Sequence, residues 1–223
     1  MLLLPVSLLA VAVYMHGSCG KTTKTKKPMV TTRRSDHAIE DFFTTRRSLY
    51  AMSGQSVTDE ELMQLFEAAR WAPSSFNAQP WRFIYAKRET KEWNVLFDLL
   101  VDFNKKWTAK AGALVLVVSR NNFEHNEKPN VSHSFDTGAA WENIALQAHL
   151  QGLVAHGMGG LDYDRARTVL NIPADYTIEM MFAVGKQGST EDLPEEMRTI
   201  DDKASERKTV QEIAFPVSKS FQK

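Results

Sequence analysis

The residues best suited to chemistry gather in short polar segments and do not form a nucleophile or acid–base set. The first segment is Arg46-Arg47-Ser48, because two guanidinium groups and a hydroxyl suit a dianionic phosphate that arginine can grip through paired hydrogen bonds. Paired arginines are also common on solvated faces. Near the other end of the chain, Arg207 and Lys208 are adjacent, and they could close the same phosphate site.

A second segment, from Ala72 to Phe83, is dense in hydroxyls and carboxamides and reads APSSFNAQPWRF. The Asn77 side chain can donate and accept at once, which suits the polar edge of a flavin ring or its ribityl hydroxyls. Ser74 and Ser75 can serve the same polyol. The plainer interpretation is that Pro, Ser and Asn simply make a turn here.

A third segment, His156 to Asp162, reads HGMGGLD and follows an expected helix. The adjacent Gly159 and Gly160 let the main chain approach a planar ligand and offer bare N–H groups. A Gly-Gly pair also occurs in ordinary turns. A histidine in such a place is more often a satisfied structural residue than a catalyst, so His156 is not assigned as an acid.

The elements that position these segments follow from capping and periodicity. Thr58 and Glu61 make a capping box that predicts a helix over 59–70, ended by Pro73. The other expected elements are a strand over 82–86, a continuous apolar and therefore central strand over 113–119, one amphipathic helix over 91–110, a helix over 136–152, a helix over 164–170 and a short strand over 180–184. The polar segment 191–208 is expected to be an irregular surface arm.

In this order and at these spacings the segments resemble the nitroreductase family of flavoproteins, and the resemblance runs from about Asp36 to Phe215. It implies an α+β sandwich with a mainly antiparallel sheet flanked by helices, and an intertwined homodimer with two FMN sites at its interface. By resemblance the FMN phosphate is held by Arg46, Arg47, Ser48, Arg207 and Lys208.

The same resemblance assigns roles to the other two segments. Ser75 and Asn77 belong to a Pro-Ser-Ser-x-Asn-x-Gln-Pro-Trp loop that contacts the flavin, and Gly159 and Gly160 to a loop that offers a backbone N–H to flavin N5. The helix over 136–152 resembles the one at the family's dimer core. The residues that choose the acceptor are expected within 89–130.

Two residues depart from the family pattern. Tyr50 stands where many relatives have Arg or Lys, and Thr209 replaces a proline. The first change is expected to weaken stabilisation of the reduced flavin at N1 and O2, and so to lower the reduction potential, unless Arg82 or the tyrosine hydroxyl compensates. Tyr50 is therefore kept among the cofactor-binding residues.

The activity implied is an oxidoreductase that takes hydride from NADH or NADPH through FMN and passes it to a nitroaromatic, a quinone, an enal or another flavin in a ping-pong cycle. The alternative is a flavin-binding carrier or sensor with little turnover. A metal site built from Glu124, His125 and His133 fits no common ligand spacing, and no metal is expected. With 27 basic and 27 acidic residues, no global field favours nucleic acid.

The chain of 223 residues, 43% apolar and 24% charged, is typical of a folded protein with one main domain. Residues 1–20 resemble a signal peptide or lipoprotein leader, residues 21–35 a basic linker, 36–216 the FMN-binding domain and 217–223 a tail. The protein is then exported, or anchored to a membrane if Cys19 is lipidated. If the true start is Met29, it is cytoplasmic.

Overall fold

The apolar run that the sequence places at the centre of the sheet is an inner strand, β2 (Ala113–Arg120), in the computed structural model of this protein. Its first seven residues are all buried. It pairs with β1 (Trp81–Lys87) on one side and β4 (Tyr176–Lys186) on the other, and β3 (Leu153–Met158) pairs with β4. Every pairing is antiparallel, so the expected antiparallel α+β architecture is confirmed.

The structure describes residues 33–203 and 205–219, which belong to one unit spanning Thr31–Lys223. The proposed leader over residues 1–20, with Cys19, lies outside the described residues, as does Met29. Only the end of the proposed linker is described. Within the described part of the chain, no helix has the length and apolar character needed to cross a bilayer.

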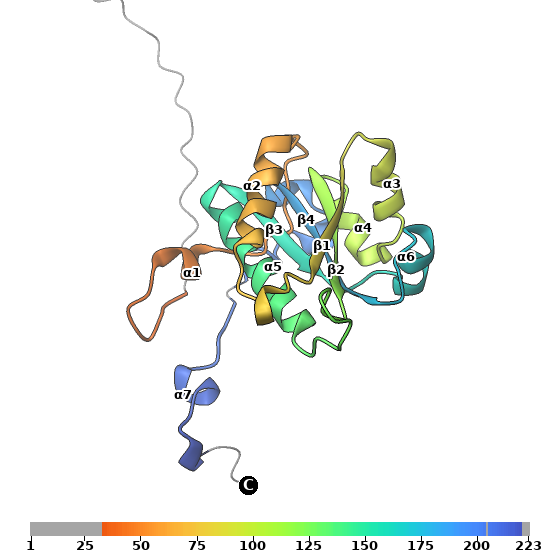
Figure 1. The fold of residues 1–223 in the computed structure, drawn as a ribbon. Helices are drawn as coiled ribbons and strands as arrows, with labels where there is room; N and C mark the ends of the chain where they lie inside the picture. Colours follow the sequence, from red (N-terminus) through yellow and green to blue (C-terminus); the bar gives the residue numbers. More distant parts are fainter. Residues whose placement is uncertain (1–32, 204, 220–223) are drawn as a thin grey trace, which may run out of the picture. The chain divides into compact units, whose positions relative to one another are not determined.

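Both faces of the sheet are covered by helices because successive side chains of a strand point in opposite directions. Leu114 and Leu116 of β2 pack into one core cluster, whereas Val115 and Val117 pack into the other. Figure 1 shows α2 and α5 on one face of the sheet and α3, α4 and α6 on the opposite face. The helices are α2 (Asp59–Arg70), α3 (Lys91–Phe97), α4 (Asp102–Thr108), α5 (His133–Leu150) and α6 (Tyr163–Val169).

Helix α2 begins where its capping box predicts. The Thr58 hydroxyl accepts the N–H of Glu61, and the Glu61 carboxylate accepts the N–H of Thr58 at 2.8 Å. The remaining helical elements are α1 (Asp41–Thr45), α7 (Val210–Ile213) and the short 3-10 turns η1 (Ser75–Asn77), η2 (Thr190–Asp192), η3 (Glu195–Met197) and η4 (Val217–Lys219).

The single helix expected over residues 91–110 is wrong, because the structure has two helices there, α3 and α4. The chain between them is extended at Val101, whose φ and ψ are −66° and 154°. The Val101 N–H donates to the carbonyl of Gly160 at 3.1 Å, and Leu100 forms an isolated bridge with Leu161. A contact with a distant loop therefore overrides the local helical periodicity.

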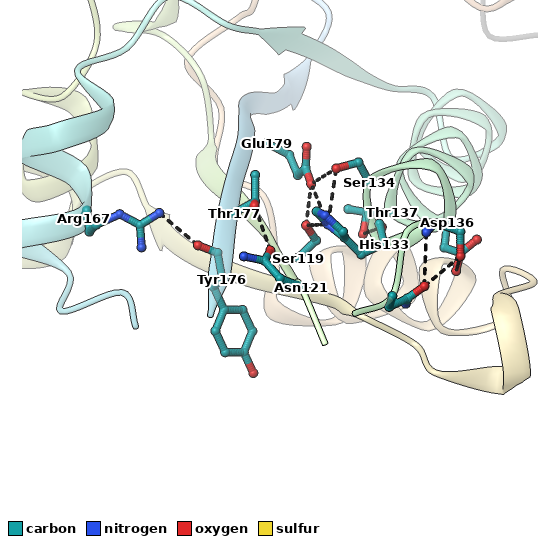
Figure 2. A network of polar contacts seen from close by, with 12 residues as sticks. Ser119, Asn121, His133, Ser134, Asp136, Thr137, Arg167, Tyr176, Thr177 and Glu179 are labelled. Carbon is teal, nitrogen blue, oxygen red and sulfur yellow. Dashed lines mark hydrogen bonds and ion pairs between the residues drawn. The ribbon is translucent and has the colours of Figure 1, made fainter. Parts of the chain in front are cut away.

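Helix α5 is anchored at its start by a polar network with two strands (Figure 2). His133 and Ser134 point toward Ser119 of β2 and Glu179 of β4; the His133 Nδ1 lies 2.7 Å from the Ser119 hydroxyl, and Ser134 donates to Glu179 at 2.6 Å. The helix thus begins three residues before the expected Asp136. Gly152, with φ +71°, follows its end.

The segment after α5 forms strand β3, which includes His156, Gly157 and Met158 and is absent from the elements that the sequence predicts. The strand has only six residues, Gly152 precedes it and Gly157 lies within it. The alternation of apolar and polar residues that predicts a strand is therefore not visible. The surface arm expected over residues 191–208 is also wrong in part, because Leu193, Met197 and Asp201 are buried. These three side chains secure a segment that looks polar in sequence.

Candidate cofactor site

A strongly basic pocket of about 300 Å³ brings together residues from both ends of the described chain. Arg46, Arg47, Ser48 and Tyr50 line it together with Arg207. Arg46 and Arg207 are about 160 positions apart in the sequence, and the fold brings them to one pocket, as the sequence predicts. The lining residues are Arg33, Arg46, Arg47, Ser48, Tyr50, Ile200, Asp201, Lys203, Ser205 and Arg207.

Local contacts orient Arg46 and Arg207 at this pocket. The Arg46 Nη1 donates to the Ser48 hydroxyl at 3.3 Å, so the guanidinium and the hydroxyl face the same space. The Arg207 Nη1 donates to the Ser205 hydroxyl at 3.1 Å and to the carbonyl of Glu206 at 2.8 Å. Both guanidinium groups keep other N–H donors, because each carries five.

Arg47 combines charge with a structural role. Its Nη2 donates to the carbonyl of Lys203 at 3.1 Å and also to the carbonyl of Asp201. The arginine therefore ties the segment after the sheet to the start of the domain. Its guanidinium also lines the pocket and brings positive charge to it.

Arg33 lines the pocket, although it belongs to the predicted basic linker over residues 21–35. It donates to the carbonyl of Arg46, which holds it against the pocket wall. Burial is the first cause that lowers its pKa, followed by the neighbouring arginine charges, led by Arg207 and Arg47. Such crowding of cations favours an anionic occupant.

Asp201 brings a carboxylate to this basic setting, and no sequence motif predicts its place. Its side chain is 4% exposed and accepts the backbone N–H groups of Tyr50 and Ala51 at 2.9 Å each. It therefore shapes the main chain that follows Ser48, and its oxygens are used within the protein.

Tyr50 lines the pocket and packs against two other rings. Its ring meets Trp107 and His156 edge to face, with ring centroids 5.1 and 4.4 Å apart. Burial, and then the charge of Asp201, raise the pKa of the Tyr50 hydroxyl. The hydroxyl is accordingly neutral near pH 7, so this position brings no charge to the pocket.

Lys208 lies apart from the group that contains Arg46. It lines a neighbouring pocket of about 640 Å³ together with Arg34, Phe43 and Arg207. Arg207 borders both spaces. Lys208 thus contributes to the same basic region but is not among the residues that line the smaller pocket.

The loop with Ser75 and Asn77 is held in an unusual backbone conformation. Phe76, Asn77 and Gln79 have φ values of 51°, 53° and 46°, which L-residues adopt rarely. The N–H of Ser75 donates to the Asp136 carboxylate at 3.0 Å. Within the described chain the exposed Asn77 carboxamide has no hydrogen-bond partner, so both its donor and its acceptor are open to a ligand.

Arg82 does not supply free charge beside this loop. It lines a pocket of about 300 Å³ with Asn77, but its guanidinium donates to the carbonyls of Gln79 and Trp81 and to Glu124 at 2.8 Å. The sequence leaves open that Arg82 supplies the positive charge that Tyr50 lacks. The ion pair with Glu124 opposes this, because it already engages the Arg82 guanidinium.

The glycine loop closes tightly against helix α4. A Cβ on Gly160 would lie 2.7 Å from the Asn104 Nδ2 and 2.9 Å from a Val101 methyl, distances that real Cβ atoms do not tolerate. A Cβ on Gly159 would meet the Tyr163 hydroxyl at 3.6 Å, an ordinary contact. Close packing thus explains why position 160 is a glycine. It does not explain the glycine at position 159, where a side chain would fit.

The basic pocket that contains Arg46 and the loop that contains Asn77 lie at opposite ends of α5. Thr45, next to Arg46, is hydrogen-bonded to His149 near the end of the helix at 2.9 Å, and Ser75 is bonded to Asp136 near its start. Thirteen residues of α-helix span roughly 20 Å. This is longer than the reach from a flavin phosphate to the polar edge of its ring.

The residues weighed as metal ligands have other partners. Glu124 pairs with Arg82 and Arg120, and His133 contacts Ser119. Among the described residues no group of three or more His, Cys, Asp or Glu side chains could hold a metal ion.

Comparison with known proteins decides the family. The family model described as "Nitroreductase family" matches residues 43–102 and 89–186. The chain belongs to the nitroreductase family. Protein DrgA of Synechocystis sp. is 30% identical over 170 residues, which cover 64% of this nitroreductase-family chain and 80% of DrgA. The "Putative NADH dehydrogenase/NAD(P)H nitroreductase SCO5049" of Streptomyces coelicolor is 29% identical over 174 residues, 69% of this chain and 87% of that protein.

Solved structures agree with this membership. A crystal structure described as an oxidoreductase containing FMN is 38% identical, with a TM-score of 0.78 and coverage of 82% of this chain and 93% of that one. A nitroreductase family protein from Streptococcus pneumoniae shares the fold at 17% identity, with a TM-score of 0.62 and coverage of 79% and 98%. The α+β nitroreductase fold is thereby confirmed.

Proposed function

We propose that this protein is an FMN-dependent oxidoreductase that takes electrons from NADH or NADPH and passes them two at a time to a small organic acceptor. The observation that carries the proposal is the pocket in which Arg46, Ser48 and Arg207 meet in a chain of the nitroreductase family. The FMN in the structural relative at 38% identity and the NAD(P)H in the Streptomyces relative's name support the choice of cofactors.

The donor set suits the cofactor. Arg46 and Arg207 would hold the phosphate with Ser48 by charge-assisted hydrogen bonds, with Arg47 and Lys208 adding positive charge nearby. Ser75 and the open carboxamide of Asn77 would meet the polar part of the flavin, and Gly159 and Gly160 its reactive edge. When bound, FMN supplies the redox chemistry by accepting a hydride at N5 and returning two electrons. The protein binds and orients it and needs no acid–base residue.

A homodimer completes the site. The residues proposed for the phosphate and those proposed for the ring lie at opposite ends of α5, too far apart for one FMN to reach both within one chain. In a two-fold dimer the same patch is used by both copies. Two antiparallel α5 helices would bring the Asn77 loop of one copy beside the Arg46 pocket of the other. The catalytic domain then comprises residues 36–216.

Acceptor and donor would use one site in turn. We assign the acceptor to the nitroaromatic, quinone or enal class, and we assign the kinetics as ping-pong, because a single face of the ring serves both reactants. Initial rates at several fixed acceptor concentrations are then expected to give parallel double-reciprocal lines. Intersecting lines would show that both reactants bind at once.

The test of the function is spectroscopic. Protein reconstituted with FMN should be yellow, release FMN on heating, and lose the visible absorbance of its oxidised flavin when NADH or NADPH is added without oxygen. Bound FMN that stays oxidised with both nucleotides would favour the flavin carrier. Failure to bind FMN would overturn both functions.

A further inference from the structure

Two side chains from different helices hold the carbonyl groups of the glycine loop. The Tyr163 hydroxyl, at the start of α6, donates to the carbonyl of Gly159 at 3.1 Å. The Asn104 Nδ2, from α4, donates to the carbonyl of Gly160 at 2.9 Å. Backbone donors reinforce both contacts: the Leu161 N–H also donates to the carbonyl of Gly159, and the Val101 N–H to the carbonyl of Gly160. The loop is therefore clamped at two successive peptide groups.

These contacts also fix the direction of the N–H groups. The carbonyl of Gly159 and the N–H of Gly160 belong to one planar peptide, and the described chain contains no cis peptide. In a trans peptide the two groups point in opposite directions. By holding the Gly159 oxygen, Tyr163 turns the Gly160 N–H away from α6.

Asn104 is itself rigidly placed. Its side chain is 7% exposed, and its Oδ1 accepts the Trp107 indole N–H at 3.2 Å. This bond settles which end of the amide faces Gly160, because an indole can only donate. Trp107 in turn packs against Tyr50, which lines the basic pocket. Packed side chains thus connect the pocket to the glycine loop.

We propose that Tyr163 and Asn104 are positioning residues that hold the glycine loop so that the Gly160 N–H faces the reactive edge of the flavin. This inference rests on the proposed function. Neither side chain needs to touch the cofactor, since each acts through a carbonyl oxygen of the loop.

The decisive variant is Tyr163→Phe, which deletes only the hydroxyl of a side chain that is 39% exposed and so spares the core. Its matched control is Tyr85→Phe, at a tyrosine 44% exposed on β1 whose hydroxyl makes no hydrogen bond within the described chain. Asn104→Asp replaces the donor with an acceptor. Its control is Asn143→Asp, at an amide that donates to the carbonyl of Ala68 at 3.0 Å, away from the loop.

The readouts are the FMN dissociation constant, the midpoint potential of the bound flavin and the melting temperature. An N–H aimed at N5 binds the oxidised ring, in which N5 accepts a hydrogen bond, better than the reduced ring, in which N5 carries a proton. Tyr163→Phe should therefore raise the dissociation constant of oxidised FMN roughly threefold to tenfold. It should also shift the midpoint potential of the bound flavin to a more positive value. Its melting temperature should match that of Tyr85→Phe.

The outcomes separate this inference from the proposed function. If wild-type protein binds FMN and both Tyr163→Phe and Asn104→Asp keep the wild-type affinity and potential, the two residues do not position the loop and only this inference is overturned. If the wild-type protein does not bind FMN, the proposed function falls and the inference falls with it. A shift in potential in the two loop variants, absent from both controls, supports the inference.

Discussion

The buried carboxylate of Asp201 accepts the backbone N–H of Tyr50, 151 residues earlier in the chain, at 2.9 and 3.1 Å. The same carboxylate accepts the N–H of Ala51. One side chain therefore joins the polar segment after the sheet to the main chain that leads out of the basic pocket. Its place beside several arginines comes from this structural duty and not from a role in binding an anion.

Asp201→Ala is expected to destabilise the fold. Two backbone N–H groups would lose their acceptor in a buried place, at a cost of roughly 2 to 4 kcal/mol in the free energy of unfolding. The measurement is urea denaturation of the variant beside Asp202→Ala, which changes the exposed neighbouring carboxylate. Equal denaturation midpoints for the two variants would show that the contacts of Asp201 do not stabilise the protein.

Elements with local causes could be predicted from sequence. Helix α2 follows from Thr58 and Glu61, and strand β2 from its unbroken apolar run. The break between α3 and α4 could not be predicted, because its cause is the carbonyl of Gly160 accepting the N–H of Val101. A contact between segments about sixty residues apart leaves no periodic signal.

The candidate site shows the same limit. Arg46, Ser48 and Arg207 carry recognisable chemistry in short motifs, and the fold places them around one pocket. Arg33 follows two threonines in a stretch that looks like a linker, and only contacts made in the fold, such as its bond to the Arg46 carbonyl, show that it lines the pocket. Asp201 and Asn104 form hydrogen bonds with backbone groups of residues far away in the sequence. The residue type alone does not predict such a contact.

Arg207→Ala should weaken FMN binding more than Lys208→Ala does. Arg207 lines the pocket that contains Arg46 and Ser48, whereas Lys208 lines only the neighbouring one. Loss of one charge-assisted phosphate contact costs roughly 1.5 to 3 kcal/mol, or about a tenfold to hundredfold rise in the dissociation constant. Fluorescence titration with FMN measures both variants. An unchanged constant for Arg207→Ala would remove that residue from the site.

The unfolding free energy is expected to fall as the pH drops below the ordinary histidine value of 6.5. Burial lowers the pKa of His156, and its hydrogen bond to the carbonyl of Leu49 at 3.0 Å only partly offsets this. The unfolded chain therefore takes up a proton at a higher pH than the folded one, so the stabilisation is complete above that value and is lost below it. His149, whose pKa is also lowered by burial, acts in the same direction.

Urea denaturation at several pH values tests this dependence. In His156→Asn the amide can replace the ring as a donor to Leu49 but does not titrate, so the variant should lose less stability than the wild type between about pH 7 and about pH 5. Parallel pH profiles for the two proteins would show that His156 is not the group responsible.

Mixing two variants that each bind FMN weakly tests whether two copies of the chain build each FMN site. Arg207→Ala removes a proposed phosphate contact, and Asn77→Ala removes a proposed ring contact at the other end of α5. In a mixed dimer, one site would carry both defects and the other site neither. Refolding the two variants together should therefore restore FMN binding and NAD(P)H oxidation above the level of either variant alone. If each chain held its own FMN, every site in the mixture would keep one defect and no recovery would appear.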